Sequence, residues 1–128
     1  MIRYSSTLDG ASELLEDTIL MKDAEAGVRG EAVVVTAGRL TKCAATARPD
    51  YILVMDTSGG TNVRTLYSAV RSDVTYEADI TGTGTIVAGL TVGTLDTAGT
   101  GVNAAVQTGG VVKVVNVDPI KKKAYIKF

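Results

Sequence analysis

Carboxylates are the commonest reactive groups in this chain, and two of them stand at a spacing that could do chemistry. Glu77 and Asp79 lie in an alternating stretch predicted to be a β-strand, where every second residue shares a face. Two carboxyl groups on one face could serve glycoside hydrolysis. A structural interpretation is preferred, because a glycan site also needs aromatic platforms and the chain has no tryptophan. Other aspartates fall mostly at expected strand ends and turns, where they bond to nearby backbone (Asp50, Asp56, Asp73, Asp96 and Asp118).

Other reactive groups are few. The single cysteine, Cys43, excludes an intrachain disulfide, and the absence of histidine removes the usual imidazole metal ligands. We expect Cys43 to be a small buried apolar residue. No nucleophile with a partnered base is found. The sequence therefore predicts no enzyme activity, no cofactor and no metal site.

Two stretches suggest phosphate binding only superficially. Residues 82–89 (GTGTIVAG) lack the lysine of a P-loop and no helix follows them. Residues 121–123 are all lysine, which suits a solvated hairpin tip better than a binding patch for phosphate or an acidic protein.

Composition indicates one globular domain. The chain has 128 residues and a mass of 13.3 kDa, and 45% hydrophobic against 21% charged residues excludes a disordered class. A net charge of -1 provides no field to attract nucleic acid. The sequence shows neither a signal peptide nor an apolar run long enough to span a membrane, so we expect synthesis in a cytoplasm and no membrane partner.

Short strands dominate the expected elements. Strands are predicted at 32–35 and 40–43, joined by a turn at Ala37 and Gly38, and further strands at 51–55, 63–69 and 74–78. Several more short strands are expected within residues 86–106. The fold class is therefore all-β, a small β-barrel or β-sandwich formed by residues 19–128. Residues 1–18 are expected to be an N-terminal arm, with at most one short helix near Ser12 to Asp17.

The end of the chain predicts a closing hairpin. Residues 111–117 (VVKVVNV) form a nearly continuous apolar run, and Asp118 and Pro119 break it before a last strand. Apolar residues at both alternating phases favour a central strand, with one face on the core and the other covered by a loop or a partner subunit.

Two stretches resemble a known family. "AGVRGEAVVVTAGRLTKCAATARPDYILVMD" is similar to the central hairpin of head decoration (capsid cement) proteins of tailed bacteriophages, and "GGVVKVVNVDPIKKKAYIKF" resembles their closing strand pair. The resemblance covers somewhat under half of the chain. It implies a non-enzymatic virion protein of compact β fold that binds the outer capsid surface and clamps neighbouring major capsid subunits. It also implies a homo-oligomer, with a trimer favoured.

Contacts with the capsid are expected from residues 2–15 of the arm and from the exposed loops 44–50 and 81–85, because an arm and loop tips reach neighbours most easily. A chain without residues 1–15 is expected to keep its β fold and to lose capsid binding. The candidate contact residues are Ile2, Arg3, Tyr4, Leu8, Leu14, Leu15, Arg48, Asp50 and Thr83.

Two alternatives stay open. The chain could be another phage structural subunit, from the tail tube or the head-tail joint, which would form stacked rings. It could also be a carbohydrate-binding or adhesion module displayed at a surface.

Overall fold

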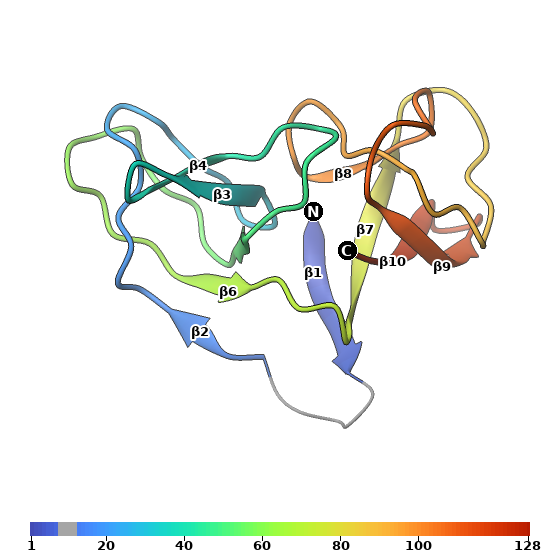
Figure 1. Cartoon of the computed structure of the whole chain (residues 1–128), viewed down its shortest axis with the longest axis horizontal. Coiled ribbons are helices and arrows are strands. Elements are labelled where there is room, and N and C mark those ends of the chain that lie inside the picture. The colour runs from blue at the N-terminus through green and yellow to red at the C-terminus, as the bar shows by residue number, and fades with distance from the viewer. Residues whose placement is uncertain (8–12) are drawn as a thin grey trace.

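The computed structural model describes residues 1–7 and 13–128, which form two five-stranded sheets and contain no helix (Figure 1). The first sheet has the order β1-β7-β10-β9, with β8 parallel to β7, and the second has the order β2-β6-β5-β3-β4. The predicted all-β class is confirmed, as an open sandwich-like domain and not a closed barrel. The strands are β1 (Ile2–Thr7), β2 (Leu15–Glu16), β3 (Ala32–Thr36), β4 (Arg39–Lys42), β5 (Tyr51–Leu53), β6 (Tyr67–Ala69), β7 (Val74–Thr81), β8 (Gly101–Asn103), β9 (Lys113–Asp118) and β10 (Lys123–Lys127).

The β3–β4 hairpin forms at the predicted turn. Thr36 pairs with Arg39, so the loop has only two residues, Ala37 and Gly38, and both have positive φ (50° and 76°). Two consecutive residues of positive φ match the twist of an antiparallel pair, which explains why a glycine follows the valine run.

The second sheet is buried on both faces where β3 pairs with β5. On one face, Ala32 and Ile52 join the larger core, which includes Tyr76 and other side chains of the first sheet. On the other face, Val33 and Leu53 pack in a smaller core with Met21, Leu40 and Tyr67. Neighbouring residues of β3 and β5 therefore point into different cores, which accounts for their consecutive apolar residues.

The prediction that residues 111–117 form a central strand is wrong, because β9 (Lys113–Asp118) lies at the end of its sheet. Val112 and Val114 are buried, but Val115 is 53% exposed. The register of β9 against β10 shifts at this point: Asn116 pairs with Tyr125 and Val114 with Ile126, so Val115 is the extra residue of a β-bulge. The bulge changes which residues face the core, and Val117 then packs against it. The continuous apolar run is explained by this change of phase, and no loop of the described residues covers Val115.

Residues 2–7, expected in an arm, are strand β1 of the first sheet. Ile2 pairs with Ala78 of β7 and is only 1% exposed. The short helix expected near Ser12 to Asp17 is not formed over residues 13–17, because Leu15 and Glu16 pair with β6, and Ser12 lies outside the described residues. Residues 1–7 and 13–128 contain no helix that is long and apolar enough to cross a membrane.

The glycine-rich segment forms fewer strands than expected. Within residues 86–106 only β8 is a strand, and isolated bridges join Gly93 to Val112 and Leu95 to Val102. A Cβ on Gly110 would lie 2.0 Å from the Gly93 carbonyl oxygen, so this glycine permits a close backbone approach.

Candidate docking surface

A groove lies between β1 and the second sheet, where both sheets meet the surface. Its volume is about 360 Å³. Ile2, Ile52 and Leu53 lie beneath the groove with side chains that are buried in the two cores, and the apolar side chains that reach its surface include Leu15 and Leu66, which are 53% and 38% exposed. We call this the β1 groove, and it is lined by Met1, Ile2, Arg3, Tyr4, Glu13, Leu15, Arg29, Gly30, Ile52, Leu53, Val54 and Leu66.

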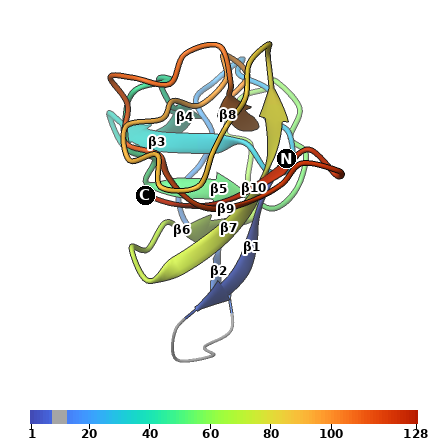
Figure 2. The ribbon, with the colours of Figure 1, turned by 90° about the vertical axis from the view of Figure 1, so that its right-hand side faces the viewer.

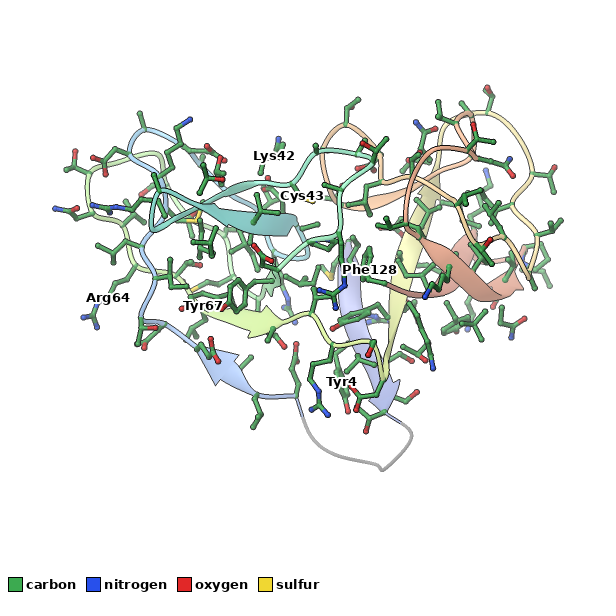
Figure 3. The ribbon with its side chains drawn as sticks, in the orientation of Figure 1. Tyr4, Lys42, Cys43, Arg64, Tyr67 and Phe128 are labelled. Carbon is green, nitrogen blue, oxygen red and sulfur yellow. The ribbon has the colours of Figure 1, made fainter. Side chains whose placement is uncertain are left out.

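A smaller hollow adjoins the β1 groove. Tyr4 and Glu13 line both, and Figure 3 shows the Tyr4 side chain projecting from β1. This second hollow has a volume of about 60 Å³ and contains Leu14, which is 71% exposed. We call it the Leu14 hollow, and its other lining residues are Glu16, Ser68, Ala69, Arg71 and Val74. Adjacent exposed leucines beside hollows form the kind of apolar surface that proteins use for docking.

The two ends of the β1 groove carry opposite charges. Ile2 N–H donates to the Gly30 carbonyl (3.0 Å), which places Arg29 near the Met1 end. Glu13 borders Tyr4 at the other end. Over residues 1–7 and 13–128, neither the Arg29 guanidinium nor the Glu13 carboxylate has an ion-pair or hydrogen-bond partner. Both charges therefore remain available to a bound partner.

Most of the predicted N-terminal contact residues come together around these hollows. Tyr4, Leu14 and Leu15 line them with exposed or half-buried side chains. Ile2 is buried in the larger core beneath the groove, so its side chain is not exposed for contact with a partner. Arg3 lines the groove, but its Nη2 donates to Glu77 Oε1 (2.6 Å), an ion pair on the strand next to β1. Leu8 was also predicted here and lies outside the described residues.

The predicted loop residues lie in neither hollow. The Asp50 carboxylate accepts the Val35 N–H (2.9 Å), and Arg48 donates to the Val70 carbonyl (3.3 Å), so both have structural roles. Thr83 is exposed in the loop after β7. These three residues are therefore separate from the groove.

Glu77 and Asp79 both form ion pairs with neighbouring cationic groups. Asp79 accepts hydrogen bonds from Lys123 and, at 2.5 Å, from the Met1 ammonium, while Glu77 pairs with Arg3. Burial opposes the ionisation of Asp79, but these cationic hydrogen bonds outweigh it and hold the pKa of the carboxyl below its usual value. A depressed pKa suits a structural anion and not a proton donor.

Cys43 is buried, as predicted. Its thiol contacts the carbonyl oxygens of Ala44 (3.3 Å) and Ala47 (3.5 Å). Burial, followed by the charge of Asp50, raises the pKa of the Cys43 thiol to about 11. The reactive thiolate is therefore disfavoured.

Among the groove residues that sequence reasoning did not single out are Glu13, Arg29 and Leu66. Thr65 and Tyr67 are buried, so the alternation of a strand turns Leu66 outward, and an outward leucine could have been noticed. Arg29 and Glu13 carry no local signal, because only the pairing of distant segments brings them to one groove.

Comparisons of the chain with protein-family models, curated proteins and solved structures found no match. In the part of the chain that the structure describes, no three Cys, Asp or Glu residues are grouped so that they could hold a metal ion.

Proposed function

We propose that this chain is a structural virion protein that binds the outer surface of a tailed-phage capsid and stabilises it by bridging neighbouring major capsid subunits. The observation that carries the proposal is Leu14, which is 71% exposed, lines a hollow and immediately precedes the edge strand β2. An exposed leucine next to a second one, Leu15, favours contact with another protein. The resemblance of the two strand-and-turn stretches to decoration proteins names the partner.

Bridging follows from association of copies with each other and with the shell. Each contact of a 13.3 kDa chain is modest, but contacts made by associated copies become effectively intramolecular and combine into avidity. Because the protein binds the assembled shell and not its dissociated subunits, the shell is stabilised by mass action. Synthesis in the host cytoplasm and assembly on the outer head surface complete the proposal.

Co-sedimentation with expanded, undecorated heads tests this function. Covering Leu14 in a contact contributes about 1–2 kcal/mol, so Leu14→Asp should weaken binding by about five- to thirtyfold, and more when avidity is lost. Val115→Asp is the control, because Val115 is also exposed but lies on the bulge of β9. The heat resistance of the decorated heads supplies a second readout.

Three outcomes would count against the proposal. Wild-type protein that does not bind heads refutes the function, and binding to glycans in a parallel assay would then favour the adhesion alternative. Full decoration by Leu14→Asp refutes the assigned contact. An equal loss of head binding by Val115→Asp shows that the Leu14 hollow is not a specific contact with the capsid.

A further inference from the structure

The tip of the β9–β10 hairpin presents an unusually exposed apolar side chain. Ile120 is 93% exposed, the highest value among the large apolar residues that the structure describes. Asp118 Oδ1 accepts the N–H groups of Ile120 (3.1 Å) and Lys121 (3.0 Å), which holds the turn in one shape. Figure 2 shows this dark red hairpin reaching beyond the neighbouring strands. A fixed turn loses little conformational entropy when its side chain is bound.

The β1 groove has the features that would accept such a tip. Its volume is about 360 Å³, and the exposed side chains of Leu15 and Leu66 give it an apolar edge. The charges also correspond. The groove offers Arg29 near one end and Glu13 near the other, both without partners in the described residues, and the tip carries Asp118 before Ile120 and Lys121 after it.

We propose that the β1 groove binds the hairpin tip of a second copy of this chain. Ile120 contacts the apolar edge formed by Leu15 and Leu66, Lys121 approaches Glu13, and the side of the tip that carries Asp118 faces Arg29. The inference rests on the proposed function, which includes self-association, and it identifies the two surfaces through which copies of the chain would associate.

A second copy fits this groove better than a glycan does. A sugar site uses aromatic platforms, and Tyr4 is the only aromatic residue that lines the groove. The chain's own tip does not fill its own groove, since Ile120 is almost fully exposed. The groove and the tip are different surfaces, so each copy can supply one of each.

Sedimentation velocity over a range of protein concentrations, without capsids, tests the contact. Ile120→Asp and Leu15→Asp should each weaken self-association by roughly tenfold or more, because each places a charge in the apolar contact. Val115→Asp is a matched control, since Val115 and Leu15 are both 53% exposed. Circular dichroism and thermal unfolding check that each variant is folded.

A mixture of the two variants is the sharper measurement. The Ile120→Asp chain keeps an intact groove, and the Leu15→Asp chain keeps an intact tip. The tip of the Leu15→Asp chain can therefore bind the groove of the Ile120→Asp chain through an unchanged contact. We expect association in the equimolar mixture that exceeds that of either variant alone.

Four results would overturn the inference: wild-type protein that stays monomeric at every concentration, folded variants that associate like wild type, an equal loss for Val115→Asp, or a mixture that associates no better than its components. Failure here is distinguishable from failure of the proposed function. A monomer that still decorates heads refutes only this contact, whereas a self-associating protein that ignores heads refutes only the capsid role.

Discussion

Strand β1 should contribute to folding as a core element, and Ile2→Ala measures this. The substitution removes three carbons from a side chain that is 1% exposed in the larger core. At about 0.8 kcal/mol per buried methylene, with a further cost for the cavity, we expect a loss of about 3 kcal/mol. For a chain of this size the melting temperature should fall by about 10 °C.

Urea denaturation followed by circular dichroism gives the free energy of unfolding, and an unchanged slope shows that the same surface is exposed. Arg3→Ala is the adjacent control. Arg3 is 62% exposed and its ion pair with Glu77 contributes at most about 0.5 kcal/mol. An Ile2→Ala loss no larger than that of the control would refute the reasoning and restore the interpretation of residues 1–7 as a peripheral arm.

Three further predictions test the core and two titrating groups. Val114→Asp should unfold the domain or cost several kcal/mol, whereas Val115→Asp should change urea stability by no more than about 0.5 kcal/mol, because the bulge turns only Val115 outward. The pKa of Cys43 rises from 9.0 to about 11, so its stabilisation is complete below pH 9 and is lost as the pH rises to 11; Cys43→Ala should lose less stability across this window. The pKa of Asp79 is lowered from 3.8 by Lys123 and the Met1 ammonium, so its stabilisation holds above that pH and is lost in more acidic solution; Asp79→Asn should show a shallower acid dependence in the same urea assay.

Local signals made the hairpins predictable. The turn at Ala37 and Gly38 needs only two residues of suitable conformation, and a proline after Asp118 ends a strand wherever it stands. The all-β class follows from the same short-range patterns of strands and turns. None of these inferences required knowledge of which strands pair.

Features that depend on pairing between distant segments were not predictable. The bulge at Val115 is defined by its register against β10, and a continuous valine run is compatible with either two covered faces or a change of phase. Likewise, Leu15 is in a strand only because it pairs with Ser68, although its local sequence favours a turn of helix. The groove combines β1, β2, β5 and the segment around Arg29, so no single stretch of sequence encodes it.

The position of β1 also decides which experiments can identify the docking surface. A chain without residues 1–15 would lose Ile2 from the core, the edge partner of β7 and one wall of the β1 groove together. Loss of capsid binding by that chain would then follow from unfolding alone and would not identify a contact. Leu14→Asp and Ile120→Asp change side chains that are 71% and 93% exposed, so they perturb binding without removing core volume. If both variants melt like wild type, a loss of decoration by Leu14→Asp and a loss of self-association by Ile120→Asp assign the two contacts separately.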